Sequence, residues 1–503
     1  FKQKTAYEML RSLVGSEMCI RDRSYTFKTK PFDHQADVLK LSWKALNWAY
    51  FMEMGTGKSK VCIDNAGILY ELGHIDTFVV VAPKGVYRNW ARIEIPVHLP
   101  DRIERDTAMW SSTPKREQKK QLESFLVPNV SENLRILVMN VEALSTVKGT
   151  RFLEQVLKKS KALFAVDEST TIKSPKARRT KAIIKIGRHA VYKRILTGSP
   201  VTQSPMDLWA QCNFLDPTLL GDVGDNFYQY QYRYAIMKKR TMGAHSFNLV
   251  VGYKNLEALA ELLKTFSSRI MKSECLDLPS KIYTQRHIQL TPDQTRIYNE
   301  IKEYALAYIS ETEFMTAPNV MTQLLRLQQV LSGHSKTDEG DIVEIKDNRL
   351  SELMQCLEDV SGKVIIWSRF RYDIKRIHAE LTKVYGPKST VTYFGDTSDE
   401  DRSNAIEHFQ NGEARFFIGN PQTGGYGITL TEANTVVYFA NSFDLAVRMQ
   451  SEDRCHRIGQ TQHVTYIDLI AEKTIDEKIV KSLRSKMDIA SKVMGEELKE
   501  WLT

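Results

Sequence analysis

The sequence predicts an α/β protein in which two parallel-sheet units follow one another in tandem, with helical insertions. Three observations support this fold class. Apolar runs typical of buried strands alternate with stretches of helical character in both halves of the chain. A glycine-rich loop suited to phosphate lies early in the first half, and the second half has no such loop. The 503 residues are enough for two or three domains, each with its own core.

Several apolar runs have the length and composition of buried parallel strands. In a parallel sheet, ligands bind at the carboxyl ends of the strands, so the residues that follow each run are candidates for a binding site. The runs in the first half are residues 78–83, 136–140, 163–166 and 195–200, and those in the second half are residues 363–367, 391–395 and 414–419.

The glycine-rich loop spans residues 53–59 and leads from an aromatic and apolar run into a stretch that we expect to be helical. Gly55 and Gly57 let the backbone curl closely round an anion, because residues with a Cβ would clash there. Backbone N–H groups and the helix N-terminus then face the phosphates. Lys58 reaches their outer oxygens, and the Ser59 hydroxyl can ligate Mg²⁺.

Two adjacent carboxylates strengthen the interpretation of this loop as a nucleotide site. Met52 stands where the usual loop has glycine, so the loop alone is also compatible with an ordinary turn. Asp167 and Glu168, however, directly follow the strand at residues 163–166. The first can hold the Mg²⁺ that Ser59 contacts, and the second can polarise the water that attacks the γ-phosphate. A solvated acidic turn is the alternative.

A pair of arginines late in the second half is a further part of the candidate site. Arg454 and Arg457 are three residues apart, which in a helix places them on one face. Guanidinium groups from a second domain can stabilise the charge that develops during phosphoryl transfer. Ordinary surface charge is the alternative for both.

Together, these motifs resemble those of the superfamily 2 helicase-like ATPases, specifically the SWI/SNF-type DNA translocases in a short bacterial or phage form. The resemblance extends from about residue 32 to residue 489, and the ending R-x-x-R-I-G-Q is its most type-specific feature. Thr170 and Thr429 depart from it, because the family often has His and Asn there. The segments that carry the resemblance are Gln35, 55–59, 82–84, 89–90, 167–168, 172–174, 196–200, 207–209, 424–427 and 454–460.

The resemblance implies two RecA-like lobes that bind ATP and Mg²⁺ in the cleft between them, with double-stranded DNA across both. The catalytic residues that it implies are Lys58, Asp167, Glu168, Arg454 and Arg457, and the metal ligands are Ser59 and Asp167. The nucleotide-binding residues that it implies are Gln35, Gly55, Thr56, Gly57, Lys58, Ser59, Gly425, Gly427 and Gln450.

The chain is expected to divide into six parts. Residues 1–23 resemble translated sequencing adaptors, and we expect them to lie outside the fold. A tyrosine-rich run at residues 227–232 is interpreted as core rather than as a platform for bases. The remaining expected parts are the ATP-binding lobe (24–206), its helical insertion (207–280), the helical insertion of the second lobe (281–345), the second lobe (346–475) and a C-terminal helix (476–503).

The amino-acid composition further narrows the class of protein to which the chain can belong. No apolar run approaches the roughly 20 residues of a membrane span, and the six cysteines form no C-x-x-C pair. Both features are expected of a cytoplasmic protein. The formal charge at pH 7 is +9, and it becomes +7 without residues 1–23, which hold five basic and three acidic side chains. A modest positive excess is compatible with a nucleic-acid partner.

The expected function is that of an ATP-dependent translocase on double-stranded DNA, acting in repair, recombination or replication. Contacts mainly to the phosphate backbone would make binding weakly sequence-specific and strongly salt-dependent. Three alternatives stay open at this point: a strand-separating DNA or RNA helicase, a non-catalytic DNA-binding scaffold, and the motor subunit of a restriction system. Protein partners are not indicated by any motif.

Overall fold

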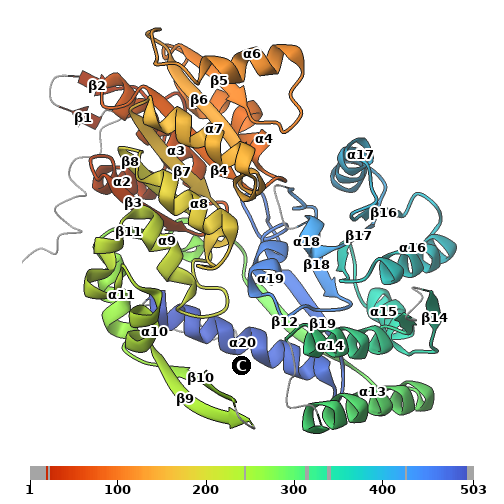
Figure 1. The fold of residues 1–503 in the computed structure, drawn as a ribbon. Helices are drawn as coiled ribbons and strands as arrows, with labels where there is room; N and C mark the ends of the chain where they lie inside the picture. The colour runs from red at the N-terminus through yellow and green to blue at the C-terminus, as the bar shows by residue number, and fades with distance from the viewer. Residues whose placement is uncertain are drawn as a thin grey trace, which may run out of the picture. The chain divides into compact units, whose positions relative to one another are not determined.

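The computed structural model describes residues 18–20, 23–242, 245–311, 317–336, 341–424 and 428–494, and it divides into two compact units (Figure 1). The first unit holds the chain up to Pro200, with Leu208–Phe227 and Lys264–Met271. The second unit holds Val201–Asp207, Tyr228–Leu263 and the chain from Lys272 onward. Each unit is organised around its own parallel sheet.

The first unit contains a seven-stranded sheet in the order β11-β3-β8-β7-β4-β6-β5, in which every neighbouring pair is parallel. The side chains of β4 and β7 are buried along their whole length, as expected for strands covered on both faces. The strands are β3 (Asn47–Met52), β4 (Thr77–Ala82), β5 (Arg105–Met109), β6 (Leu134–Asn140), β7 (Ala162–Asp167), β8 (Tyr192–Leu196) and β11 (Ser267–Ile270).

Helices connect these strands as a parallel sheet requires, since each parallel connection must cross over the sheet. A core of buried side chains, including Phe78 and Trp90, packs against one face of the sheet. The helices are α2 (Asp33–Ser42), α3 (Lys58–Glu71), α4 (Tyr87–Asn89), α5 (Ile95–His98), α6 (Arg116–Ser124), α7 (Val147–Lys158), α8 (Arg178–Gly187) and α9 (Asp207–Leu215). A short antiparallel pair, β1 (Met18–Ile20) and β2 (Arg23–Tyr25), precedes them.

The second unit contains a six-stranded parallel sheet in the order β12-β19-β18-β15-β17-β16. Successive side chains point to opposite faces, so Ile366 joins one core and Trp367 the other. The strands are β12 (Lys281–Ile288), β15 (Lys363–Trp367), β16 (Thr390–Tyr393), β17 (Phe416–Gly419), β18 (Ala433–Tyr438) and β19 (Val464–Ala471).

Three of the helices in the second unit pack against one another around a core of their own. Side chains of α13, α14 and α20 share a third core that includes Tyr298, Leu327 and Ile479. The helices are α13 (Pro292–Glu311), α14 (Ala317–Leu331), α15 (Arg349–Glu358), α16 (Arg371–Tyr385), α17 (Asp399–Gln410), α18 (Pro421–Gly424), α19 (Leu445–Glu452) and α20 (Ile475–Met494). The remaining elements are α10 (Phe227–Tyr234), β9 (Ala235–Met242), β10 (His245–Tyr253), α11 (Leu256–Lys264), α12 (Lys272–Cys275), β13 (His334–Lys336) and β14 (Ile342–Glu344).

All the strands expected from apolar runs are present, and the structure adds others. β5 and β12 are edge strands that contain polar and partly exposed side chains, so neither is a continuous apolar run. The segment at residues 207–280 was expected to be helical, but it contains the antiparallel ribbon β9–β10 and the sheet strand β11. The physical reason is that pairing partners far away in the sequence stabilise a strand that local composition does not indicate.

One buried arginine joins several segments in each unit. Arg194 donates to Asn65 Oδ1 (3.0 Å) and to four backbone carbonyls, at 2.8 to 3.1 Å. Arg349 donates to Asp476 and to three backbone carbonyls. In both cases one guanidinium donates to carbonyl groups of several segments, including the Ala45 carbonyl in the first unit and the Leu331 carbonyl in the second.

Replacing Arg194 by methionine tests this role in the first unit. We expect the free energy of unfolding to fall by about 3 kcal/mol, because each buried acceptor left without a donor costs about 1–3 kcal/mol. Thermal and denaturant unfolding would measure the change. Arg188→Met is the matched control, since Arg188 is exposed, and an exposed substitution alters stability by only about 0.5 kcal/mol. Equal losses in the two variants would contradict the assignment.

Candidate active site

The phosphate loop between β3 and α3 has the backbone that its glycines predict. Gly55 and Gly57 adopt φ values of 83° and 92°, in the left-handed region that other residues avoid. The Thr56 amide and hydroxyl both donate to the Glu53 carbonyl, at 3.3 and 2.7 Å, and these bonds close the loop. Helix α3 then begins at Lys58 without a side-chain cap. Its first N–H groups therefore suit an anion.

Lys58 lies where a phosphate-binding lysine is expected. Its side chain is buried, and its amino group donates to the Glu53 carbonyl at 3.3 Å. Ser59 follows as the second residue of α3 and is half-buried. Both side chains thus belong to the first turn of the helix, beside the N–H groups of the loop.

Gln35 supports the loop from α2. Its amide nitrogen donates to the Thr56 carbonyl at 3.1 Å, and its amide oxygen accepts from the Phe32 N–H at 3.1 Å. A Cβ at position 57 would lie 2.1 Å from the Gln35 nitrogen and would displace this amide, and the φ of 92° also favours glycine there. Gln35 thus contacts the loop, and its predicted role in reading adenine remains a prediction.

Asp167 ends β7 and is held by two N–H donors. The Trp90 indole donates to Oδ2 at 2.8 Å, and the Glu168 amide donates to Oδ1 at 2.9 Å. Burial raises the pKa of the Asp167 carboxyl above its usual range, while the Trp90 hydrogen bond and the charge of Lys58 act in the opposite direction. A buried carboxylate with a raised pKa is still short of positive charge.

These residues fit a Mg²⁺ ion. The ion prefers oxygen ligands, and in nucleotide sites it takes one or two from the protein and the others from phosphate and water. Asp167 supplies a buried carboxylate, and Ser59 supplies a hydroxyl at the start of α3. In the described part of the chain, no group of three or more His, Cys, Asp or Glu side chains could hold a metal by itself.

Glu168 has a strained backbone, with φ 47° and ψ 58°. This left-handed conformation costs a non-glycine residue about 1–3 kcal/mol and is found mostly at functional sites. Next to it, the Ser169 hydroxyl donates to Gln211 Oε1 at 2.7 Å, and the Gln211 amide donates to the Pro200 carbonyl at 2.9 Å. The acidic turn is therefore joined to the segment that follows β8.

The segment after β8 also packs against the phosphate loop. A Cβ at Gly198 would lie 3.2 Å from the Met54 nitrogen, so glycine allows this close approach. Arg269 of β11 donates to the Gly198 carbonyl at 3.0 Å and to the Phe51 carbonyl at 3.1 Å. The segments at the carboxyl ends of β3, β7 and β8 are thus joined to one another, and their joint role as a site remains a prediction.

The arginine pair of the second unit differs from the sequence prediction. Helix α19 ends at Glu452, so Arg454 and Arg457 lie in the turns that follow it and do not share a helical face. Both guanidinium groups instead donate to the Ile428 carbonyl, at 3.2 and 3.3 Å. Arg454 is only 2% exposed and also donates to the Gln450 carbonyl at 2.8 Å, whereas Arg457 is half-buried.

Gln450 is buried. Its role in binding the nucleotide remains a prediction. Gly425 and Gly427, also predicted to bind nucleotide, lie outside the described residues.

Acidic residues just before the arginine pair anchor this segment. Lys272 donates to Asp453 Oδ1 at 2.6 Å and to the His456 carbonyl at 2.8 Å. Burial would raise the pKa of Asp453, but the charges of Lys272 and Lys281 hold it below its usual value. Glu452 accepts from Arg448 at 2.8 Å and from Lys281 at 3.1 Å. The arginine turns therefore rest on a network of buried ion pairs.

Sequence reasoning did not assign the roles of Trp90, Arg448 and Lys272. Trp90 falls in a segment that carries the resemblance, but nothing in its local sequence indicates a carboxylate partner 77 residues away. Arg448 and Lys272 act through partners from β19 and from the turns after α19. Such contacts depend on the fold and leave no pattern in the chain.

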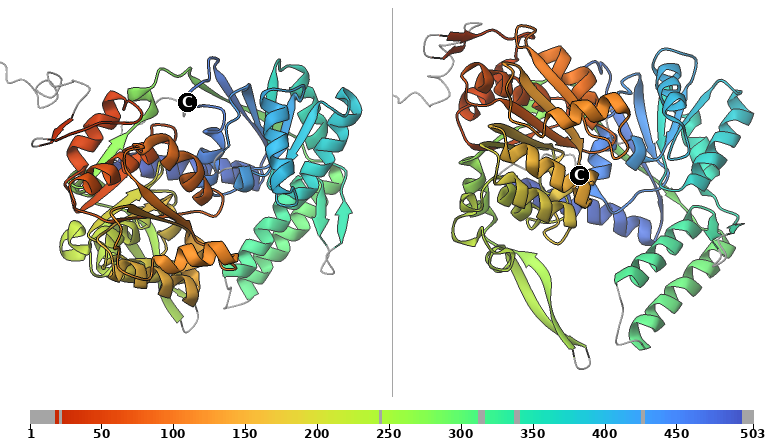
Figure 2. Two further views of the ribbon diagram at one scale, coloured as in Figure 1. Left: turned by 90° about the horizontal axis from the view of Figure 1, so that it is seen from above. Right: turned by 45° about the horizontal axis from the view of Figure 1, so that its top comes forward.

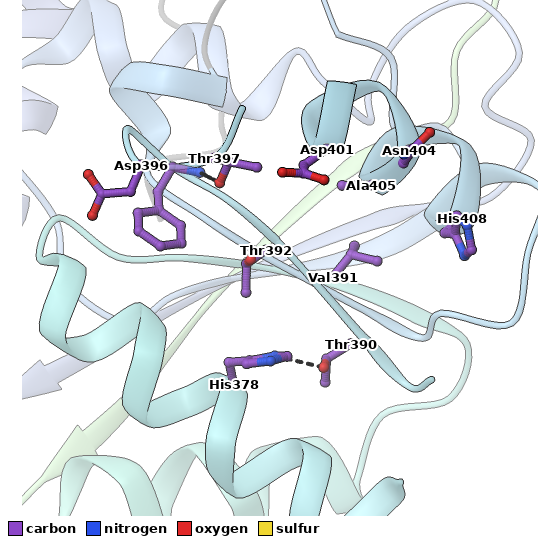
Figure 3. Close-up of a pocket in the computed structure, with 11 residues that line it drawn as sticks. His378, Thr390, Val391, Thr392, Asp396, Thr397, Asp401, Asn404, Ala405 and His408 are labelled. Atoms are coloured by element: carbon purple, nitrogen blue, oxygen red, sulfur yellow. Dashed lines mark hydrogen bonds between the residues drawn. The ribbon is translucent and has the colours of Figure 1, made fainter. Parts of the chain in front are cut away.

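A cavity of about 490 Å³ in the second unit is separate from the predicted residues (Figure 3). It lies beside the edge strand β16 and is lined by side chains of α16 and α17. His378 pairs with the Thr390 hydroxyl at 2.8 Å, and burial lowers the pKa of this histidine. None of the predicted site residues lines the cavity.

Comparison with known proteins places these motifs in a family. A model of the SNF2-related domain matches residues 34–336, and a model of the helicase conserved C-terminal domain matches residues 346–459. A putative ATP-dependent helicase/translocase of Bacillus subtilis is 24% identical over 484 residues, which cover 91% of this chain and 48% of that protein.

An uncharacterised ATP-dependent helicase of Mycoplasma pneumoniae is 27% identical over 339 residues, which cover 66% of this chain and 30% of that protein. The chain thus spans less than half the length of these two relatives. Among solved structures, the Sulfolobus solfataricus SWI2/SNF2 ATPase core in complex with dsDNA matches with a TM-score of 0.41 and 24% identity, covering 94% of this chain and 95% of that one. No helix in the described ranges is long and apolar enough to cross a membrane.

Replacing Trp90 by phenylalanine tests its action on Asp167. The variant keeps an aromatic ring but loses the N–H donor, so the carboxylate is less well oriented toward a metal. We expect the Mg²⁺ concentration for half-maximal ATP turnover to rise roughly tenfold, as for other residues that orient a metal ligand. Trp110→Phe is the control, because Trp110 is also buried but packs against Phe152. An unchanged Mg²⁺ requirement in the Trp90 variant would exclude this role.

The strained backbone of Glu168 gives a second test. In an assay of the ATP hydrolysis expected from the sequence, Glu168→Gln and Glu168→Gly should both abolish turnover, because each removes the carboxylate predicted to act on water. The glycine variant should be at least as stable as the glutamine variant, since glycine adopts φ 47° without the strain of about 1–3 kcal/mol. Phosphate release and chemical denaturation would measure the two effects. A glycine variant that is clearly less stable would show that the turn is not strained.

Proposed function

The chain belongs to the SNF2-related family, and from this premise we propose that it hydrolyses ATP to move along double-stranded DNA. The observation that best supports the proposal is the site at the carboxyl ends of β3 and β7. There, a preformed phosphate loop and a buried carboxylate held by Trp90 lie in one unit. The match to the helicase C-terminal domain supports a second unit that takes part in the same cycle.

We propose that the loop binds the phosphates of ATP through its backbone. The N–H groups at the start of α3 face the anion, and the helix dipole favours negative charge there. Lys58 would exchange its bond to the Glu53 carbonyl for a phosphate oxygen. Gln35 keeps the loop in place through Thr56, and its position beside Gly57 supports a further contact with the base.

Ser59 and Asp167 are the residues proposed to hold Mg²⁺. The bound ion would neutralise charge on the phosphate oxygens, and it would supply the positive charge that the buried Asp167 carboxylate lacks. The N–H donors of Trp90 and Glu168 orient this carboxylate before any ion binds.

Glu168 is proposed to orient the attacking water and to accept its proton. Its backbone is left-handed, whereas Asp167, the preceding residue, is the last residue of the β7 strand. Arg457 is proposed to stabilise the charge that develops on the transferred phosphoryl group. Arg454, which is buried on two carbonyls, is proposed to hold the Arg457 turn in shape and so to act on catalysis through it.

The proposed partner is double-stranded DNA, bound mainly through its phosphates. The formal charge of +9 supports a polyanionic partner, and the Bacillus subtilis relative is named a putative helicase/translocase. The proposed setting is repair, recombination or replication in the cytoplasm of a bacterial or phage-infected cell, in keeping with bacterial relatives.

Phosphate release with and without duplex DNA tests the proposal. We expect duplex DNA to stimulate turnover of the parent protein, and we expect Lys58→Ala to abolish turnover because the phosphates lose their cation. Triplex displacement should be positive and unwinding of a forked duplex negative. The proposal would be wrong if duplex DNA did not stimulate turnover, or if the Lys58→Ala variant turned over ATP as fast as the parent. Efficient unwinding of the fork would instead identify a strand-separating helicase.

A further inference from the structure

The β9–β10 ribbon is a part of the second unit that the proposed ATP site does not use. It pairs with no other described strand, and Figures 1 and 2 show it extending away from α10 and α11. Its register runs from the pair Met242–His245 to the pair Ala235–Tyr253, with an irregularity between Val250 and Gly252. At eight or nine residues a strand, it reaches about 25 Å.

This ribbon adds little to the stability of the fold. A two-stranded hairpin by itself is only marginally stable, and the ribbon leaves apolar side chains exposed, including Ile236, Leu249 and Val251. Exposed apolar and basic groups on a projecting ribbon are better explained by a partner that covers them than by packing within the unit.

The charge of the ribbon indicates what that partner is. Residues 235–254 contain no Asp or Glu, although the whole chain has 61 of them. The segment carries four cationic side chains, those of Lys238, Lys239, Arg240 and Lys254. Lys238 and Lys239 are exposed, and as neighbours in a strand they lie on opposite faces. Neither has an ion-pair partner within the described parts of the chain. A partner with many closely spaced negative charges complements such a surface.

Two exposed tyrosines lie at the base of the ribbon. Tyr228 and Tyr232 are 69% and 76% exposed and four residues apart on α10, so they share one helical face. Lys254, which follows β10, places its amino group 5.0 Å from the centre of the Tyr232 ring. The tyrosine-rich run at residues 227–232 was predicted to be core, but Tyr230 is its only buried tyrosine.

We infer that the β9–β10 ribbon and this tyrosine face bind duplex DNA, as a contact surface separate from the ATP site. Lysines on both faces suit a ribbon that lies between two phosphate strands, and the major groove is wide enough to admit a two-stranded ribbon. The tyrosine rings offer apolar surface and a hydroxyl beside the sugar-phosphate backbone. The inference rests on the proposed function for its choice of DNA as the polyanion.

The test is direct binding of the full chain to a fluorescent duplex without ATP, between about 50 and 200 mM salt. In the Lys238→Gln/Lys239→Gln variant, we expect weaker binding to all sequences, and a salt dependence whose slope falls by about 1 for each lysine. ATP turnover without DNA should equal that of the parent, because neither lysine belongs to the ATP site. Both substitutions are at exposed positions, so folding should be preserved.

A variant with the same change in charge elsewhere provides the control. Lys383 and Lys388 are exposed lysines of the second unit, each near a single acidic residue. Lys383→Gln/Lys388→Gln should leave the salt slope unchanged. Equal effects of the two double variants, or an unchanged slope in the ribbon variant, would overturn the inference and leave a protein partner as the explanation of the ribbon. A parent that binds the duplex but shows no DNA-stimulated turnover would instead contradict the proposed function alone.

Discussion

The burial of one carboxylate, that of Asp167, is the constraint on which the site of the first unit depends. A buried anion is costly unless hydrogen bonds or opposite charges compensate for the lost water. Here the Trp90 indole and the Glu168 amide satisfy one oxygen each, and Lys58 contributes a positive charge. The raised pKa shows that this compensation is incomplete. A divalent cation, as proposed above, would supply the positive charge that this buried carboxylate lacks.

The residues around the phosphate loop also hold it in shape. Gln35 holds the Thr56 carbonyl, and Gly198 allows the segment after β8 to lie against Met54. The loop after β3 is therefore held by α2 and by the segment after β8. A loop organised in this way loses little conformational freedom when it binds, because most of its ordering has occurred on folding.

The second unit places its charges differently. Around the arginine turns, cations and anions are paired and buried, and Arg448 lies 3.6 Å from the centre of the Tyr438 ring and pairs with Asp468 at 2.5 Å. Such a network gives a turn a defined shape, because the removal of either partner would leave an uncompensated charge. On the β9–β10 ribbon, in contrast, Lys238 and Lys239 are exposed. Buried charges thus stabilise the arginine turns, and exposed charges remain available to a partner.

The α/β class, the strands with continuous apolar runs and the grouping of the phosphate loop with Asp167 could all be predicted from the order of residues. Apolar periodicity and glycine placement are local properties of the chain. The geometry of a parallel sheet then brings the carboxyl ends of its strands to one edge. Three features became evident from the folded chain alone: Trp90 donates to Asp167, Arg454 is buried, and an antiparallel ribbon lies within residues 207–280. These features arise from partners distant in the chain. A side chain's neighbours across a fold, and hence its burial and charge, exist only once the chain has folded.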